Sequence, residues 1–213
     1  MVEYIMHMGD DETVCNAARV SFDKTADMFS VGQNERLINY LAKHNHWSPF
    51  SHCSIQLRFT APIFIARQLA KHQIGFAWNE VSRRYVDVKP TFWLPESGEL
   101  RMKAANVKQG SSDNVHPNSI EYMMEWDDIQ AKAEKLYNYM VSNGVCPEQA
   151  RAILPQSMET QWIWTGSLYA WSRMYNLRID SHAQLEVQWY AREVDLIICN
   201  LFPISWRALK EVE

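Results

Sequence analysis

The segment SIQLRFTAPIFIARQLAKHQ, residues 54–73, carries the clearest secondary-structure signals of the chain. Apolar and polar residues alternate from Ser54 to Thr60, as in a β-strand with one buried face. Thr60 and Pro62 then have the residue types of a helix N-cap and a first helical turn, which predicts a helix from Pro62 to about Gln73. We therefore expect a strand that leads directly into a helix.

Helices and extended segments are expected on both sides of this stretch. Apolar residues at helical spacing predict helices over 11–20, 35–44, 120–144, 147–153, 166–176 and 184–200. Extended structure is favoured over 79–88 and 158–164, where aromatic and β-branched residues are frequent. Residues 103–119 are polar and lack periodicity, so we expect a surface loop there. This mixture predicts an α+β fold.

Length and composition indicate one globular domain. The 213 residues are 47% hydrophobic and 22% charged, a balance typical of folded proteins. No repeat, low-complexity tract or linker interrupts the chain, so we expect a single domain over 1–213. Apolar runs such as 61–66 are too short for a membrane helix, and no signal sequence is visible. No membrane association and a cytoplasmic location are the resulting expectations.

Positive charge is concentrated in one stretch of an otherwise acidic chain. The protein has 21 Lys and Arg against 25 Asp and Glu, a net charge of −4 and a pI near 6.0. Residues 67–85, RQLAKHQIGFAWNEVSRRY, carry a net charge of +3, which leaves −7 for the rest of the chain. This distribution argues against a nucleic-acid partner, because a phosphate backbone requires a more extended basic surface.

The basic stretch has the residue types that bind a small phosphorylated ligand. Only 7 glycines are present, and no glycine-rich phosphate loop occurs, so arginine and lysine side chains must hold any phosphate. Gln68, Lys71 and His72 have the spacing of one helix face, with 79–84 expected nearby. The alternative is a solvated helix end with ordinary ion pairs.

Cysteines and histidines give no metal pattern. Cys15, Cys53, Cys146 and Cys199 lack paired or metal-binding spacing, which indicates free and mostly buried thiols. The histidine-rich segment 44–52 fits no zinc motif and has a Ser-Pro pair that breaks a helix, so we expect a turn. No metal site is predicted.

Several motifs along the chain together resemble the flavin-dependent thymidylate synthases. The signature of that family is Arg-His-Arg, seven or eight residues, then Ser; here Lys71-His72-Gln73 is followed after eight residues by Ser82. Further blocks similar to the family are ARVSFD (18–23), HWSPFSH (46–52), APIFIARQ (61–68), NEVSRRY (79–85), ARAILP (150–155) and LRIDSHAQ (177–184). These blocks extend over nearly the whole chain.

The resemblance implies a fold, a reaction and a set of site residues. It implies a single domain with a central, mostly antiparallel sheet flanked by helices, assembling as a homotetramer. The implied reaction is reductive methylation of dUMP to dTMP, with FAD as cofactor and with methylenetetrahydrofolate and NADPH as co-substrates. The dUMP-binding residues would be Gln68, Lys71, Glu80, Val81, Ser82, Arg83, Arg84, Arg151 and Arg178, with Arg178 as the catalytic residue. The FAD-binding residues would be Ser21, His46, Ser48, Lys71, His72, Gln73, Asn79, Glu80, Ser167, Tyr169, Arg173 and His182.

The chain departs from the family pattern at some of these positions. Lys71 and Gln73 replace the two signature arginines, which removes bidentate geometry at the first and charge at the second. Arg173 and Arg83 stand where the family often has Asn and Gly, and we hypothesise that they compensate. Two alternatives stay open: a nucleotide-binding flavin oxidase or reductase without methyl transfer, and a catalytically inactive nucleotide-binding protein.

Overall fold

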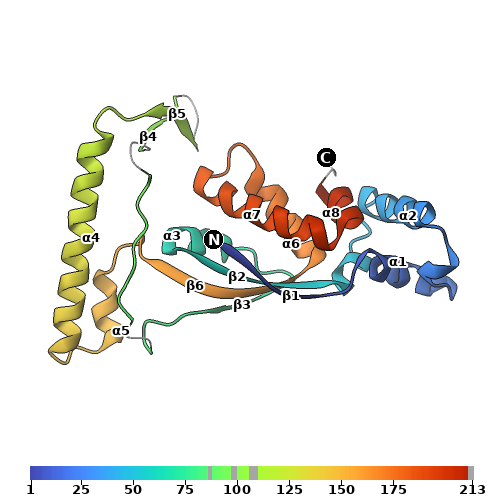
Figure 1. Ribbon diagram of the computed structural model, residues 1–213, viewed down its shortest axis with the longest axis horizontal. Helices are drawn as coiled ribbons and strands as arrows, with labels where there is room; N and C mark the ends of the chain where they lie inside the picture. Colours follow the sequence, from blue (N-terminus) through green and yellow to red (C-terminus); the bar gives the residue numbers. More distant parts are fainter. Residues whose placement is uncertain (86–87, 97–99, 106–109, 211–213) are drawn as a thin grey trace. The chain divides into compact units, whose positions relative to one another are not determined.

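The computed structural model describes residues 1–85, 88–96, 100–105 and 110–210, which form an α+β fold (Figure 1). The strands are β1 (Val2–Met8), β2 (Ser54–Pro62), β3 (Phe76–Glu80), β4 (Arg101–Lys103), β5 (Ser111–Val115) and β6 (Glu159–Ser167). The α-helices are α1 (Asp11–Arg19), α2 (Val31–Lys43), α3 (Ile63–Leu69), α4 (Ser119–Ser142), α5 (Pro147–Ala150), α6 (Leu168–Ile179), α7 (Leu185–Leu201) and α8 (Pro203–Lys210). Short 3-10 turns lie at Val20–Phe22, Ala26–Met28, Pro49–His52 and Arg151–Ile153.

The main sheet has the strand order β1-β2-β6-β3 and is antiparallel. In β1 and β2 the register runs from Val2 opposite Phe59 to Met8 opposite Ser54. In β6 and the chain around β3, the Ser167 amide donates to the Gly75 carbonyl and the Val81 amide to the Gln161 carbonyl, so these strands run in opposite directions. Strands β4 and β5 pair separately as a hairpin. The expected α+β class with an antiparallel sheet is confirmed.

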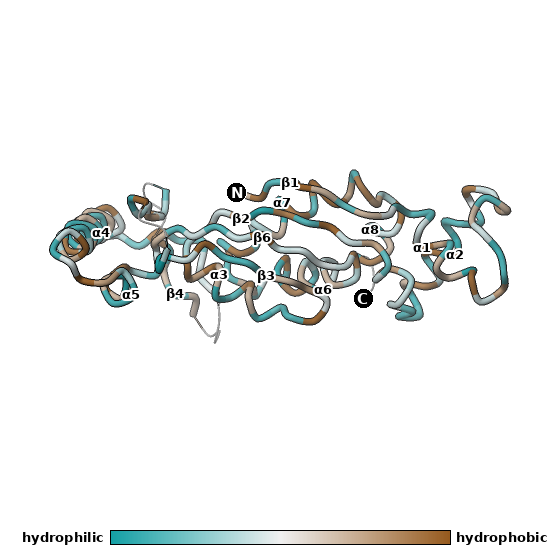
Figure 2. Tube along the Cα trace, turned by 90° about the horizontal axis from the view of Figure 1, so that it is seen from below, coloured by the Kyte–Doolittle hydropathy of each residue, from teal (hydrophilic) through white to brown (hydrophobic). Residues whose placement is uncertain are grey.

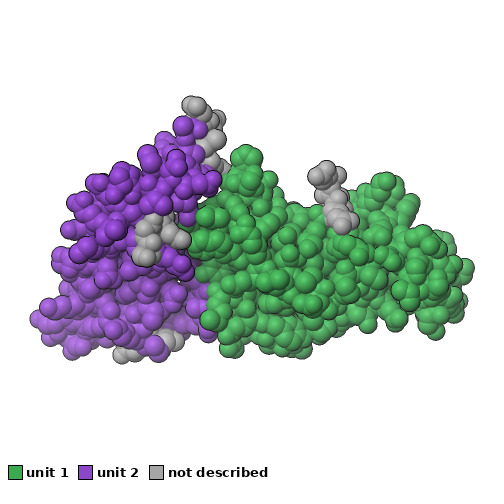
Figure 3. All heavy atoms as spheres, turned by 45° about the horizontal axis from the view of Figure 1, so that its top comes forward, with its two compact units in different colours: residues 1–59, 72–79, 163–213 green, residues 60–71, 80–162 purple. Residues whose placement is uncertain are grey.

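The chain divides into two compact units (Figure 3). Unit 1 comprises 1–59, 72–79 and 163–213, and unit 2 comprises 60–71 and 80–162. The expectation of one domain over 1–213 stays a prediction. Among the described residues, no helix combines the length and apolar composition that crossing a bilayer would need.

Aromatic packing on one face of β2 forms the core of unit 1. Residues Ile55, Leu57 and Phe59 alternate along the strand and are fully buried, as expected for a strand with one covered face. The Phe59 ring stacks on Trp171 of α6, with centroids 6.1 Å apart, and the Trp171 indole Nε1 donates to the Ile55 carbonyl at 3.1 Å. Helix α6 is therefore fixed to the sheet by both apolar and polar contacts.

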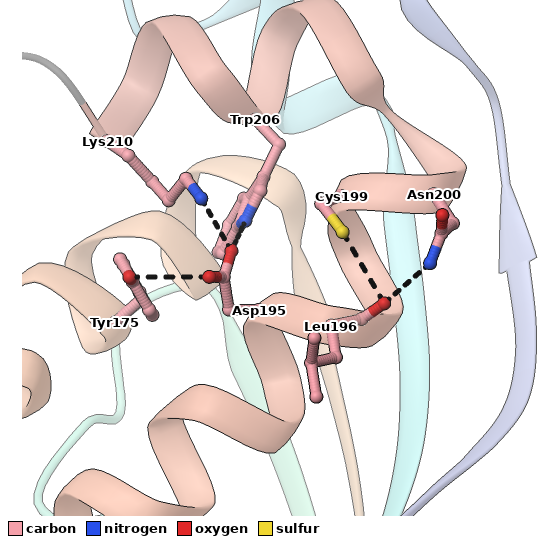
Figure 4. Close-up of polar contacts among 7 residues, drawn as sticks. All are labelled: Tyr175, Asp195, Leu196, Cys199, Asn200, Trp206 and Lys210. Carbon is pink, nitrogen blue, oxygen red and sulfur yellow. Dashed lines mark hydrogen bonds and ion pairs between the residues drawn. The ribbon is translucent and has the colours of Figure 1, made fainter.

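Asp195 of α7 joins three helices in unit 1 (Figure 4). One of its carboxylate oxygens accepts from the Trp206 indole at 2.7 Å and from the Lys210 ammonium at 2.6 Å, both on α8. The other accepts from the Tyr175 hydroxyl of α6 at 3.5 Å. Burial, followed by the charge of Asp195, raises the pKa of Tyr175, so the phenol stays a hydrogen-bond donor.

Asp11, at the start of α1, caps the N-terminus of α8. Its two carboxylate oxygens accept from the backbone amides of Ile204 at 3.0 Å and Ser205 at 2.8 Å. A carboxylate at this position satisfies amides that have no partner within the helix and favours the positive end of its dipole. The contact therefore links the first helix of unit 1 to its last.

The core of unit 2 is organised around a buried glutamine of α4. The Gln130 amide donates to the Ser157 hydroxyl at 2.7 Å and to the Trp93 carbonyl at 3.0 Å. Trp93 packs edge-on against Phe64 of α3, with ring centroids 5.3 Å apart. Apolar and polar residues are interspersed along α4 (Figure 2), and Ile120 is 71% exposed. Part of the apolar surface of α4 therefore faces solvent.

The structure corrects several sequence-based expectations. Helix α3 ends at Leu69, not near Gln73, and Thr60 lies within β2 and is not an N-cap. Extended structure ends at Glu80 and a turn follows at 83–85, while 86–87 lie outside the described residues. The expected loop over 103–119 contains most of the β4–β5 hairpin, although 106–109 are not described.

The cysteines are free, as predicted, but only half of them are buried. Cys15 and Cys53 are buried, and burial raises their pKa values to about 11 and about 12. Cys146 is exposed and Cys199 is intermediate, so the expectation of mostly buried thiols is wrong for these two. Their spacing alone did not distinguish the two environments.

Candidate active site

The predicted site residues are distributed over both compact units. All predicted nucleotide-binding residues except Arg178 belong to unit 2, together with Lys71 and Glu80 of the flavin set. The members in unit 1 are Ser21, His46, Ser48, His72, Gln73, Asn79, Ser167, Tyr169, Arg173, Arg178 and His182.

In unit 1, His72 and Arg178 form a direct polar contact. His72 lies in the turn between α3 and β3, and Arg178 lies in the last turn of α6. The guanidinium Nε of Arg178 donates to the imidazole Nε2 of His72 at 2.8 Å, and both side chains are partly buried. Residues 106 positions apart in the sequence are thereby joined into one polar cluster.

The electrostatic environment of this cluster is positive. Burial, followed by the charges of Arg178 and Arg173, lowers the pKa of His72 to about 4. Burial also lowers the pKa of Arg178. His72 is therefore neutral at physiological pH, and the two arginines supply the positive charge. A cationic field of this kind is suited to an anionic ligand.

The aromatic rings of Trp164 and Phe76 lie beside His72. The His72 ring lies 6.5 Å from that of Trp164, which is fully buried in β6. Trp164 in turn stacks on Phe76 of β3 at 4.4 Å. A Cβ atom on Gly166 would lie 2.3 Å from the Phe76 ring, so only glycine allows this packing. These two rings restrict the positions that the His72 side chain can adopt.

A second, exposed cluster in unit 1 surrounds Asn45. This residue has a left-handed backbone with φ of 54°, which ends the chain reversal after α2. Its side-chain oxygen accepts from the Tyr169 hydroxyl at 2.8 Å, and Tyr169 also lies 6.2 Å from the Trp47 ring. Trp47 lies between the predicted site residues His46 and Ser48 in the sequence. This geometry brings the 46–48 segment close to the start of α6.

The remaining flavin-set residues of unit 1 have local roles or exposed positions. The Ser167 hydroxyl accepts from the Ala170 amide at 3.2 Å and caps α6. His182 is exposed and lies 2.9 Å from the Asp180 carboxylate, whose pKa is lowered by hydrogen bonds from the His182 amide and ring. Ser21, Gln73 and Asn79 are exposed.

In unit 2, Ser82 and Arg84 form an exposed polar turn. The Ser82 hydroxyl accepts from the Arg84 backbone amide at 3.3 Å and from its guanidinium at 3.5 Å. The guanidinium also lies 4.0 Å from the Glu148 carboxylate of α5. The neighbouring Arg83 donates to the Val88 carbonyl. This turn gathers two arginines and a hydroxyl, a donor set that suits a phosphate.

Two other unit 2 residues, Glu80 and Gln68, differ in their hydrogen bonding. The Glu80 carboxylate accepts from the Thr160 hydroxyl of β6 at 2.7 Å. Gln68 has a side-chain oxygen that is buried and has no hydrogen-bond partner within the described part of the chain. Lys71, Val81 and Arg151 are exposed. The expectation that Gln68, Lys71 and His72 share one helix face is wrong, because α3 ends before Lys71.

Some residues in these clusters were not singled out from the sequence. Thr160, Trp164, Asn45 and Glu148 contact predicted site residues through contacts described above. The aromatic and threonine-containing composition of 158–164 predicted a strand there, which was the available signal for Trp164. The other three are joined to their partners by tertiary contacts that no local pattern reveals.

A surface hollow elsewhere in unit 2 contains none of the predicted site residues. It has a volume of about 440 Å³ and is lined by Pro117, Asn118, Ile120, Glu121, Met124 and Glu125 around the start of α4. These residues include two carboxylates and no basic side chain. The hollow therefore lacks the charge that a phosphorylated ligand requires.

Comparisons with known proteins match nearly the whole chain. The family model described as thymidylate synthase complementing protein matches residues 3–204. A flavin-dependent thymidylate synthase of Thermosipho africanus is 37% identical over 200 residues, which are 92% of this chain and 82% of the relative. A protein of the same name from Thermus thermophilus is 32% identical over 210 residues, or 99% and 75% of the two chains.

A solved structure has the same fold. It is the UMP/dUMP methylase PolB from Streptomyces cacaoi bound with 5-Br dUMP, with a TM-score of 0.87 and 27% sequence identity. The similarity covers 100% of this chain and 95% of that one. The same enzyme bound with 5-Br UMP matches with the same TM-score and covers 96% of that chain.

Proposed function

The chain belongs to the Thy1 family of thymidylate synthase complementing proteins, and from this membership we propose that it methylates dUMP to dTMP with FAD as cofactor. Methylenetetrahydrofolate would supply the carbon and NADPH the reducing equivalents. In balance, dUMP, methylenetetrahydrofolate, NADPH and a proton give dTMP, tetrahydrofolate and NADP⁺. The observation that carries the proposal is the guanidinium of Arg178, held by His72 within a cationic cluster.

The proposed role of Arg178 is to stabilise negative charge on the pyrimidine ring. Carbon–carbon bond formation at C5 is favoured when the ring is electron-rich, as it is after loss of the N3 proton. A fixed cation favours the ionised ring without the cost of reorientation during the reaction. Because Arg178 is partly buried, water screens its charge less than at an exposed site.

The residues of unit 1 fit the charge of FAD. Burial, followed by the charges of Arg178 and Arg173, lowers the pKa of His72, and the positive field beside His72 would favour an anionic cofactor. The side chains that would hold FAD are Ser21, His46, Ser48, Lys71, His72, Gln73, Asn79, Glu80, Ser167, Tyr169, Arg173 and His182. When bound, FAD would relay hydride from NADPH to the transferred carbon unit.

The unit 2 residues would hold the nucleotide. Ser82 and Arg84 supply a hydroxyl and a guanidinium for the phosphate, and the long Arg84–Glu148 ion pair costs little to exchange for a phosphate contact. The full proposed set is Gln68, Lys71, Glu80, Val81, Ser82, Arg83, Arg84, Arg151 and Arg178. The buried, unpartnered oxygen of Gln68 is an acceptor that a bound ligand or water would satisfy.

We also propose that the protein assembles as a homotetramer. Met6 and Met8 of β1 are 56% and 61% exposed, and Met124 and Ile129 of α4 are 70% and 58% exposed. Large exposed apolar side chains on a strand and a helix are typical of surfaces that become buried between subunits. Light scattering after size-exclusion chromatography measures the assembly size, and a monomeric mass would contradict the proposal.

A second candidate substrate is UMP, because the similar methylase PolB is named for both UMP and dUMP. Tritium release from dUMP or UMP labelled at C5 distinguishes the two, since attachment of a carbon at C5 displaces the hydrogen there. We expect release from dUMP, with formation of dTMP. Release from UMP alone would identify a ribonucleotide methylase. Oxidation of NADPH without release from either substrate would support a flavin oxidase or reductase.

Substitution of Arg178 tests the proposed role directly. Arg178→Ala should lower kcat by about 10²–10³, the usual cost of removing a preorganised charge-stabilising donor. The flavin absorbance of the purified variant should persist, because most of the proposed FAD contacts are intact. A variant that retains FAD and full turnover would refute the role of Arg178. A colourless wild type that takes up no FAD would refute the flavin reaction itself.

A further inference from the structure

The hydrogen bond between Arg178 and His72 determines the protonation of the histidine. A guanidinium nitrogen can only donate, so His72 Nε2 must accept in the 2.8 Å contact. A neutral imidazole carries one proton, which must then lie on Nδ1. The surroundings favour the neutral form, since the ring is partly buried, its centroid lies 6.5 Å from that of the buried Trp164, and the charges nearby are those of Arg178 and Arg173.

The bond is made through one particular atom of the guanidinium. It uses Nε, at the inner end of the group, and does not occupy the terminal Nη1 and Nη2 atoms. A hydrogen bond at Nε restricts the directions in which the outer edge of the planar guanidinium can point. The outer edge carries the paired donors that meet a planar ligand such as a pyrimidine carbonyl.

We propose that His72 is a positioning residue that fixes the guanidinium plane of Arg178 against the substrate pyrimidine without neutralising its charge. This inference rests on the proposed function, because it assigns the pyrimidine as the target of Arg178. A carboxylate in the place of His72 would also orient the arginine, but it would cancel the positive charge that stabilises an ionised ring. A neutral imidazole orients the group and preserves that charge.

Three substitutions separate orientation from charge. His72→Ala removes the acceptor, and His72→Gln replaces it with a neutral amide oxygen that reaches a similar position. His72→Glu provides an acceptor but adds a negative charge. His116→Ala serves as a control for loss of a histidine, since His116 lies outside the predicted site. Thermal denaturation of each variant identifies any that fails to fold.

The first measurement requires no substrate. In ¹⁵N spectra of the histidine-labelled protein at neutral pH, with His72 assigned from its loss in His72→Gln, we expect an Nδ1-protonated ring with a bare Nε2. A protonated Nε2 would overturn the inference, whatever reaction the protein catalyses. This result is therefore independent of the proposed function.

The second measurement uses the FAD-loaded enzyme. We expect His72→Ala to lower kcat about tenfold or more, in line with the loss of a hydrogen bond to a charged group, with a smaller change in the dissociation constant of dUMP. His72→Gln should restore most of that loss, whereas His72→Glu should not. Equal kcat values for the Ala and Gln variants would overturn the inference.

The ionisation of a bound pyrimidine is a third measurement. If His72 had only a structural role, its substitution would not change this ionisation. We expect the ultraviolet titration of bound 5-fluoro-dUMP to give a lower ring pKa in wild type and His72→Gln than in His72→Glu. An unchanged ring pKa in His72→Glu would contradict the argument from charge. A wild type with neither ring ionisation nor turnover of dUMP would refute the proposed function and the inference together.

Discussion

Two arginines in the predicted site are held in opposite ways. Arg178 in unit 1 is partly buried and bonded at 2.8 Å to a neutral histidine that is itself supported by a buried tryptophan. Arg84 in unit 2 is exposed and lies 4.0 Å from the exposed carboxylate of Glu148. The first contact fixes a side chain, whereas the second leaves it adjustable.

The difference matches the separate roles that we propose for the two residues, one in the chemistry and one in binding. A group that stabilises charge in a transition state must already be oriented when the charge appears, and the hydrogen bond of Arg178 to His72 suits the role that we propose for it. A group that captures a flexible phosphate benefits from adjustment, and an exposed ion pair is weak enough to be exchanged. Experiments that weaken the support of Arg178 or remove the partner of Arg84 therefore test this contrast.

The largest expected effect comes from removing the aromatic support of the His72–Arg178 pair. Trp164→Ala should lower the free energy of unfolding by about 3–5 kcal/mol, because it leaves a large cavity in the core of unit 1. Trp47→Ala is the matched control: its side chain is 54% exposed, so the loss should be much smaller. Urea denaturation measures both, and similar losses in the two variants would contradict the assigned burial.

The next largest effect is a pH dependence of the free energy of unfolding, which originates in His72. The unfolded chain binds a proton near pH 6.5 at this position, but the folded protein binds it only near pH 4. As pH falls through this interval, protonation therefore favours the unfolded state and stability decreases. We expect about 1–2 kcal/mol from this group, after allowing for solvent access to the ring.

His72→Gln is the control for this titration, since an amide does not titrate. The difference in unfolding free energy between wild type and His72→Gln should change between pH 6.5 and pH 4 and stay constant above pH 7. Chemical denaturation at several pH values gives this difference. A constant difference throughout would show that the folded pKa of His72 is ordinary.

The strands and helices of unit 1 illustrate how much the sequence predicts. The alternation in 54–60 and the periodicity of 11–20 and 184–200 place β2, α1 and α7 within one or two residues of their observed bounds, because side-chain burial follows the period of each element. The strand β1 and the helix α8 were not predicted. Helix α8 depends on tertiary contacts with Asp11 and Asp195.

A smaller effect is expected at Arg173, which adds positive charge near His72 without a hydrogen bond to it in the described contacts. Arg173→Ala should weaken FAD binding about tenfold, or ~1.4 kcal/mol, through loss of a charge that compensates for Gln73. Fluorescence titration with FAD measures the dissociation constant. Arg207→Ala, on α8 and outside the predicted site, is the control, and an unchanged affinity in Arg173→Ala would remove the compensation hypothesis.

The smallest effect concerns the exposed partner of Arg84. Glu148→Gln should change the unfolding free energy by less than about 0.5 kcal/mol, because both side chains are exposed and the ion pair is long. It should strengthen dUMP binding slightly, since Arg84 then has no competing carboxylate. Calorimetric titration with dUMP gives the affinity, and a marked loss of stability would contradict the contrast between the two arginines.

The site was predicted from the sequence only in part, and the reason is physical. Motif resemblance selected His72 and Arg178, but the contact between them depends on where α3 ends and where α6 ends. Helical spacing wrongly placed His72 on the same face as Gln68, because α3 stops at Leu69. Contacts between residues more than 100 positions apart, such as His72–Arg178, are properties of the fold and not of local spacing.

The discontinuity of unit 1 has a consequence for synthesis of the chain. Its segments 1–59 and 163–213 are separated by residues 60–162, of which only 72–79 belong to unit 1, and the bonds from Asp11 to Ile204 and Ser205 connect its two ends. On the ribosome, the strands of 1–59 must wait for α6, α7 and α8 before their apolar face is covered. During that interval Ile55, Leu57 and Phe59 lack the helices that cover them in the folded protein, so we expect the nascent chain to expose an apolar strand face until 163–213 has been translated.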